Sequence, residues 1–143
     1  MMQNDEMLTI WVIDDDNIFT FGFNKLMQNS ALKGQMIVFN SATTAIEQFT
    51  DQTKQARLPD VMFVDINMPV MSGWEFIEKF GKISAQTGKN IPVYIISSSV
   101  ALNDIERAKN NPLITDYILK PIDQDLLNAI LSTLRGSANG LAV

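Results

Sequence analysis

Short apolar runs alternate along this chain with longer stretches in which apolar residues recur every three or four positions. The short runs, such as residues 8–13 and 61–64, are too short for helices and are typical of buried parallel strands. The longer stretches have the period of amphipathic helices. The pattern predicts strands at residues 8–13, 35–39, 61–64, 93–96 and 116–119, and helices at residues 18–28, 42–53, 74–85, 101–109 and 123–134.

Residues suited to helix ends support this division. Ser41 is a suitable N-cap for the second helix, as is Asp16 or Asn17 for the first, because their side-chain oxygens accept hydrogen bonds from the first turn. Gly88 and Asn90 are expected to end the third helix. Two helices are expected to turn apolar stripes toward the core, the first at Ile18, Phe19, Gly22, Phe23, Leu26 and Met27, and the last at Leu126, Leu127, Ile130, Leu131 and Leu134.

Five strand–helix units in succession predict an α/β fold. Such units form a parallel sheet that is covered by helices on both faces and joined by right-handed crossovers. The chain has 143 residues, which fits one domain, and we see no internal repeat or linker. We expect residues 1–135 to form this domain and residues 136–143 to form a short, flexible C-terminal tail.

Composition narrows the class of protein. Hydrophobic residues make up 46% and charged residues 19% of the chain, which is ordinary for a soluble globular protein. The net charge of −5 argues against a nucleic-acid surface. The N-terminal residues do not resemble a signal peptide, and no apolar run approaches a membrane span, so we expect a cytoplasmic protein without a membrane partner. The sequence contains no histidine, so any imidazole in the chemistry must come from another molecule.

Charged residues follow three of the predicted strands. Asp14, Asp15 and Asp16 come after the first strand, Asp65 after the third and Lys120 after the fifth. Because ligands bind at the carboxyl ends of the strands in such sheets, we expect these side chains to converge there. Clustered carboxylates stay ionised together only beside a cation, and an oxygen-rich site of this kind suits Mg²⁺. The sequence therefore predicts metal-assisted phosphate chemistry centred on Asp65.

Four blocks of sequence resemble the receiver domain of two-component response regulators. In chain order they read WVIDDDN, DVMFVDINMPVMSGWEF, IPVYIISSS and DYILKP, and together they span nearly the whole chain. Their order and spacing carry the resemblance, since any single block would be a weak signal. The resemblance implies a flavodoxin-like (βα)5 doubly wound parallel sheet with the strand order 2-1-3-4-5.

The resemblance also implies roles for particular residues. Asp65 matches the phosphoacceptor, and Asp14 and Asp15 match the acidic pair that binds Mg²⁺ together with Asp65. The backbone carbonyl of Asn67 is the further metal ligand that the resemblance implies.

Residues after the last two strands match the switch that responds to phosphorylation. Ser97 matches the switch hydroxyl, Tyr117 the aromatic residue that changes rotamer with it, and Lys120 the lysine that binds the phosphoryl group. Pro121 is implied to follow a cis peptide bond. Simpler interpretations remain open, because Asp65 alone would fit a turn, Ser97 a polar loop and Tyr117 ordinary packing.

The function that follows is signalling rather than enzymatic catalysis. A histidine kinase or histidine phosphotransfer protein is expected to phosphorylate Asp65. A surface formed by residues 101–109, 116–119 and 123–135 is then expected to bind an unknown downstream protein. We expect a monomer or a weak, phosphorylation-dependent dimer.

Two other classes of function compete with this one. A small Mg²⁺-dependent phosphohydrolase of the haloacid-dehalogenase type also uses an aspartate nucleophile at a strand end. That family needs a second aspartate two residues later, where this chain has Asn67, and places its nucleophile on the first strand. A flavodoxin would need a phosphate-binding loop after the first strand, and the carboxylates there would repel phosphate.

Overall fold

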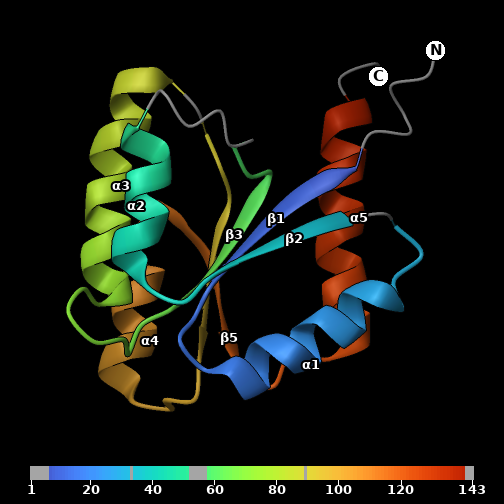
Figure 1. The fold of residues 1–143 in the computed structure, drawn as a ribbon, viewed down its shortest axis with the longest axis horizontal. Coiled ribbons are helices and arrows are strands. Elements are labelled where there is room, and N and C mark those ends of the chain that lie inside the picture. Colours follow the sequence, from blue (N-terminus) through green and yellow to red (C-terminus); the bar gives the residue numbers. More distant parts are fainter. Residues whose placement is uncertain (1–6, 33, 52–57, 89, 141–143) are drawn as a thin grey trace.

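Five parallel strands form the centre of the molecule (Figure 1), which we describe from a computed structural model covering residues 7–32, 34–51, 58–88 and 90–140. The strands are β1 (Leu8–Ile13), β2 (Gly34–Phe39), β3 (Val61–Asp65), β4 (Val93–Ser97) and β5 (Ile114–Leu119). They lie in the order β2-β1-β3-β4-β5, which confirms the predicted flavodoxin-like topology. Because all pairs are parallel, every carboxyl end lies along the same edge of the sheet.

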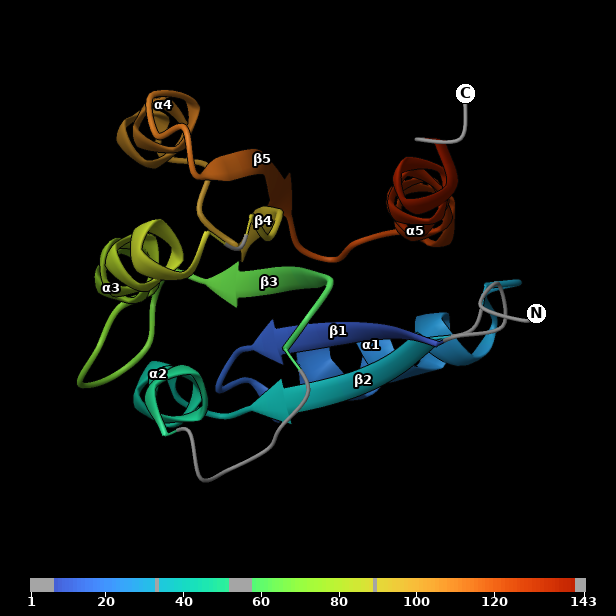
Figure 2. The ribbon, with the colours of Figure 1, turned by 90° about the horizontal axis from the view of Figure 1, so that it is seen from above.

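Helices cover both faces of the sheet. The helices are α1 (Asn17–Gln28), α2 (Ala42–Thr50), α3 (Gly73–Thr87), α4 (Leu102–Lys109) and α5 (Gln124–Gly140). Figure 2 shows α1 and α5 on one face and α2, α3 and α4 on the other. None of the helices in the described part of the chain combines the length and apolarity that a membrane span requires.

The sheet separates two hydrophobic cores. Successive residues of a strand point to opposite faces, so Trp11 of β1 lies in the core under α2 and α3, whereas Val12 lies in the core under α1 and α5. Two of the three inner strands, β1 and β3, are buried along their whole length. This double burial explains why their sequences are almost continuously apolar.

Side-chain caps begin the first three helices. Asp16 accepts hydrogen bonds from the N–H groups of Ile18 and Phe19, and Ser41 accepts one from Thr44 at 3.2 Å, as predicted. A capping box that was not predicted starts α3, where Ser72 and Glu75 each bond the other's backbone N–H. Gly88 ends α3 at a φ of 74°, a left-handed conformation that glycine adopts without strain.

Several expected boundaries and burial assignments were wrong. Residue 53, the expected end of the second helix, lies outside the described residues, and α2 ends at Thr50. The last helix continues to Gly140, past its expected end at residue 134, and residues 141–143 are outside the described part. The expected tail of residues 136–143 stays a prediction. Ile18 was expected in the apolar stripe but is 85% exposed. The buried residues of α1 are Thr20, Phe23 and Met27 instead. Leu126 is also exposed rather than part of the core.

Candidate functional site

Three carboxylates meet where β1 and β3 end. Ile13 pairs with Val64, so the next residues along each strand, Asp14 and Asp65, emerge side by side at the carboxyl edge. Carboxylate oxygens of Asp14, Asp15 and Asp65 all lie within 4.8 Å of one another. Asp14 and Asp65 are buried, whereas Asp15 is exposed. The arrangement combines two fixed carboxylates with one that is open to solvent.

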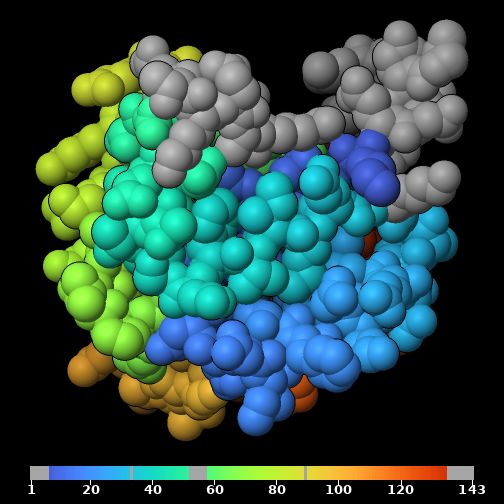
Figure 3. Space-filling view, viewed as in Figure 1, coloured from blue at the N-terminus to red at the C-terminus, as the bar shows by residue number. Residues whose placement is uncertain are grey.

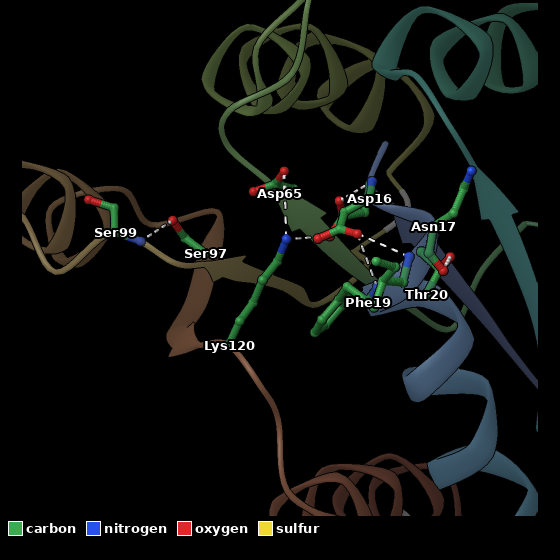
Figure 4. A network of polar contacts seen from close by, with 10 residues as sticks. Asp16, Asn17, Phe19, Thr20, Asp65, Ser97, Ser99 and Lys120 are labelled. Carbon is green, nitrogen blue, oxygen red and sulfur yellow. Dashed lines mark hydrogen bonds and ion pairs between the residues drawn. The ribbon is translucent and has the colours of Figure 1, made fainter.

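The ammonium group of Lys120 lies between the two buried carboxylates. Figure 4 shows it pointing toward Asp65. The lysine nitrogen is 2.9 Å from Oδ2 of Asp14 and 3.9 Å from Oδ2 of Asp65. Lys120 follows β5, where its backbone N–H donates to the carbonyl of Ser97 at 2.9 Å, and its peptide bond to Pro121 is cis. The closer contact is with Asp14, so the lysine is only partly engaged with Asp65.

Burial and crowding perturb the acidic groups. Burial raises the pKa of Asp65 to about 6, and the charge of Asp14 acts in the same direction. Lys120 and the backbone N–H of Asn67 oppose this rise. Burial also raises the pKa of Asp14, against the opposing hydrogen bond from Asp16 and the charge of Lys120. The protein therefore leaves the ionised carboxylates incompletely compensated.

This donor set fits a divalent cation. Three carboxylates face one ammonium group, so the fully ionised cluster keeps an excess of negative charge. The carboxylate oxygens are hard ligands close enough together to contact one ion, and the exposed position of Asp15 leaves access for solvent ligands. Of the three consecutive aspartates, Asp16 does not join the cluster, because its side chain caps α1.

The loop after β3 is folded tightly against Asp65. The backbone N–H of Asn67 bonds the Asp65 carboxylate, and Asn67 itself is exposed. Gly73 donates its N–H to the carbonyl of Ile66 at 3.1 Å. A Cβ at position 73 would lie 2.7 Å from Cα of Ile66 and would also meet the carbonyl oxygen of Asp65. Glycine is therefore required here for close approach of the loop to the strand.

Ser97 and Tyr117 occupy different positions relative to the cluster. Ser97 is the buried last residue of β4, one position beyond Ile96, which pairs with Asp65. Its Oγ accepts a hydrogen bond of 3.0 Å from the N–H of Ser99. Tyr117 pairs with Ile95, farther from the edge, and its hydroxyl reaches the carbonyl of Ser99 at 2.8 Å.

Two further residues contribute to this region. Phe19 lies beside Lys120, whose nitrogen is 4.6 Å from the centre of the phenyl ring. The helical period assigned Phe19 to the core, and no sequence signal marks it as a neighbour of the lysine. Ser99 bonds both Ser97 and Tyr117, and these contacts were not predicted from the sequence.

Known proteins resemble this chain along most of its length. It is 33% identical over 121 residues to an uncharacterized response regulatory protein of Vibrio cholerae, an alignment that covers 85% of this chain and 46% of that protein. The chain spans about half the length of curated relatives of this kind.

Solved structures agree with the sequence comparisons. A two-component response regulator from Cytophaga hutchinsonii matches with a TM-score of 0.79 at 25% identity, covering 90% of this chain and 97% of that one. A response regulator receiver protein from Dyadobacter fermentans matches with a TM-score of 0.74 at 33% identity, covering 89% and 97%.

The phosphohydrolase alternative is not favoured by these findings, since Asp65 ends the third strand in a fold shared with signalling domains. A family model for the response regulator receiver domain matches residues 10–132. With the matching sheet order, this shows that the chain belongs to the response regulator receiver domains of two-component systems.

Proposed function

We propose that Asp65 accepts a phosphoryl group from a phosphohistidine on another protein. The observation that carries this proposal is the position of Lys120, whose ammonium lies between the buried Asp14 and Asp65. The carboxylate of the exposed Asp15 lies close to both of these aspartates. Histidine is absent from these 143 residues, so the donor imidazole lies outside them. A histidine kinase or a histidine phosphotransfer protein has the required chemistry.

The transfer is a direct displacement at phosphorus. A carboxylate oxygen of Asp65 forms the new P–O bond while the P–N bond to the donor imidazole breaks, and the departing imidazole takes a proton from solvent. The nucleophile must be ionised, and its pKa of about 6 leaves it mostly ionised at neutral pH. The ammonium group of Lys120 stabilises the charge that develops on the phosphoryl oxygens.

We propose that the carboxylates of Asp14, Asp15 and Asp65, with the backbone carbonyl of Asn67, hold Mg²⁺. When bound, Mg²⁺ neutralises the charge on the cluster and on the incoming phosphoryl group. Support comes from the close grouping of carboxylate oxygens within 4.8 Å and from the raised pKa values of Asp14 and Asp65.

The donor is proposed to bind beside α1. A hollow of about 470 Å³ opens next to Lys120 and is lined by Ile18, Phe19, Gly22 and Pro121, among others. The apolar side chain of Ile18 is 85% exposed at this hollow. Figure 3 shows the surface of α1, in blue, open along the lower part of the molecule. A donor that covers Ile18 would bring its imidazole close to Lys120 and Asp65.

The output surface is proposed to lie around α4 and β5. Among the eight residues of α4, all described, only Ala108 is buried, so little apolar contact fixes the helix. A second hollow, of about 340 Å³, lies between α4 and β5 and is lined by Ile105, Tyr117 and Leu119, among others. We propose that phosphorylation changes this surface through Ser97 and Tyr117, which would let a downstream protein or a second copy of the chain bind.

Phosphorylation by a small donor tests the proposal. Incubation with acetyl phosphate and Mg²⁺ should add one phosphoryl group, measured by intact-protein mass spectrometry. Asp65→Asn should abolish the addition, and Asp116→Asn, at an exposed aspartate of β5, should leave it unchanged. Phosphorylation of Asp65→Asn to the parent level would refute the assignment.

A further inference from the structure

The helix α4 begins differently from the three helices that precede it. Asp16, Ser41 and Ser72 cap α1, α2 and α3 with side-chain oxygens, but Ala101 stands at this position in α4 and has only a methyl group. Ser99, two residues before this position, holds the start of the helix in another way. Its Oγ accepts a hydrogen bond from the N–H of Ala101 at 3.1 Å and donates one to Oδ2 of Asp104 at 3.0 Å.

The same serine is bonded to the other side of the site. Its N–H donates to Oγ of Ser97 at 3.0 Å, as Figure 4 shows. Its carbonyl oxygen accepts a hydrogen bond of 2.8 Å from the hydroxyl of Tyr117. Ser99 therefore connects the end of β4, the middle of β5 and the first turn of α4 through four hydrogen bonds.

We infer that Ser99 is a positioning residue that makes the first turn of α4 depend on the hydroxyl of Ser97. The inference rests on the proposed function, in which Ser97 turns toward a phosphoryl group on Asp65. In the structure Oγ of Ser97 points into the loop and accepts from Ser99. When Ser97 turns to donate to the phosphoryl group, the N–H of Ser99 loses this acceptor and the loop can move. The bonds from Ser99 to Ala101 and Asp104 then loosen, and the first turn of α4 loses these two contacts.

Few buried side chains hold the first turn of α4, so the loss of these hydrogen bonds has a large effect. Leu102 and Asn103 are exposed, and Asp104 and Ile105 are only half-buried, so packing contributes little to holding the first turn. An element with few buried contacts opens locally at low cost, and a small number of hydrogen bonds decides how often it does so. Asp104 also carries its charge at the positive end of the helix dipole, where the bond from Ser99 orients it.

Hydrogen exchange of backbone amides tests the resting state of this network. NMR would measure exchange at Ala101, Asp104 and Ile105 in the unphosphorylated protein, in Ser99→Ala and in Ser99→Thr. Ser99→Ala should exchange roughly three- to tenfold faster, the factor expected for the loss of about one net hydrogen bond. Ser99→Thr keeps the hydroxyl and should exchange at the parent rate. Equal exchange in all three proteins would overturn the inference.

Addition of beryllofluoride and Mg²⁺, which mimic a phosphoryl group on Asp65, distinguishes transmission from simple capping. The parent protein and Ser99→Thr should show faster exchange in the first turn of α4, whereas Ser99→Ala should show no further increase. An equal increase in Ser99→Ala would mean that Ser97 acts on α4 by another route, and the inference would be wrong. Fluorine NMR of the same samples reports bound beryllofluoride. If no beryllofluoride is bound to the parent protein, the phosphoacceptor proposal fails. If beryllofluoride is bound but the effect of Ser99 is missing, only the inference about Ser99 fails.

Discussion

The guanidinium group of Arg107 stacks on the indole ring of Trp74, with its central carbon 4.5 Å from the ring centre. Trp74 lies in the first turn of α3, directly after the loop that follows Asp65, and Arg107 lies in the last turn of α4. The contact therefore joins the surroundings of Asp65 to the helix that we propose to move.

Trp74 should report movement of α4 by fluorescence. Binding of Mg²⁺ and beryllofluoride should change the emission, because a shift of α4 alters the cation–π contact. Trp74→Phe should remove the change, leaving the emission of the fully buried Trp11. Arg107→Ala should reduce the change and cost about 0.5–1 kcal/mol of stability, and Lys109→Ala, an exposed cation on the same helix, should do neither. An undiminished signal in Arg107→Ala would argue against a moving contact.

Replacement of Lys120 by methionine should separate metal binding from phosphorylation. Lys120→Met keeps a long side chain beside Phe19 but removes the charge that compensates Asp14 and Asp65. Mg²⁺ should bind more tightly, because the lysine no longer competes for the carboxylates. Phosphorylation by acetyl phosphate should slow roughly a hundredfold, as expected for the loss of one charged donor. Calorimetry and mass spectrometry check the two effects, and weaker Mg²⁺ binding would contradict the assigned role.

The raised pKa of Asp65 should make stability depend on pH when divalent cations are removed. The pKa of this group is about 6 in the folded protein against 3.8 as its ordinary value, so the folded state binds the proton more tightly. The contribution to the free energy of unfolding is then largest below pH 3.8, falls as the pH rises to about 6 and is lost above it. In chelator, the difference between the parent and Asp65→Asn should change by on the order of 1–3 kcal/mol across this window. Saturating Mg²⁺ should flatten the curve, and parallel curves in chelator would disprove the shift.

Val70 should be replaceable by glycine with a gain in stability. Its φ of 70° places a β-branched residue in the left-handed region, and its side chain is 97% exposed. Val70→Gly relieves this strain and should raise the free energy of unfolding by about 0.5–1 kcal/mol. Val100→Gly is the matched control, because Val100 is also exposed but has an ordinary φ, and it should lower stability by a similar amount. Urea denaturation of both variants measures these changes. A lower free energy of unfolding in both variants would exclude strain at Val70.

Substitution by alanine should change stability in opposite directions at two glycines. A Cβ at Gly73 would lie 2.7 Å from Cα of Ile66, so Gly73→Ala should cost about 2–3 kcal/mol and disturb Asp65. A Cβ at Gly22, within α1, would meet no atom within 4 Å, so Gly22→Ala should gain about 1 kcal/mol from helix propensity. Thermal unfolding measures both changes. A neutral Gly73→Ala would show that the loop after β3 can relax.

Much of the acidic site was predictable because of one property of parallel sheets. Apolar runs that end in Asp14, Asp65 and Lys120 were enough to expect that these side chains meet, since the carboxyl ends of parallel strands share an edge. The strand order itself came from the resemblance of the four sequence blocks, because hydrophobic periodicity identifies strands without saying which of them are neighbours. The dual use of the aspartate run, with Asp16 as cap and Asp14 and Asp15 in the cluster, was also expected in outline.

The sequence by itself determined which segments are strands and helices, since local periodicity and capping chemistry act over a few residues. Only the tertiary structure decided which side of a helix is covered, and so Ile18 is open at the proposed donor surface although it belongs to an apolar stripe. It also decided that Phe19 lies beside Lys120 and that Ser99 joins Ser97, Tyr117 and Asp104. Phe19 and Lys120 lie far apart in the chain, and a serine such as Ser99 is common in polar loops. The contacts exist because packing of helices on the sheet brings separate segments together, and a linear pattern does not record that packing.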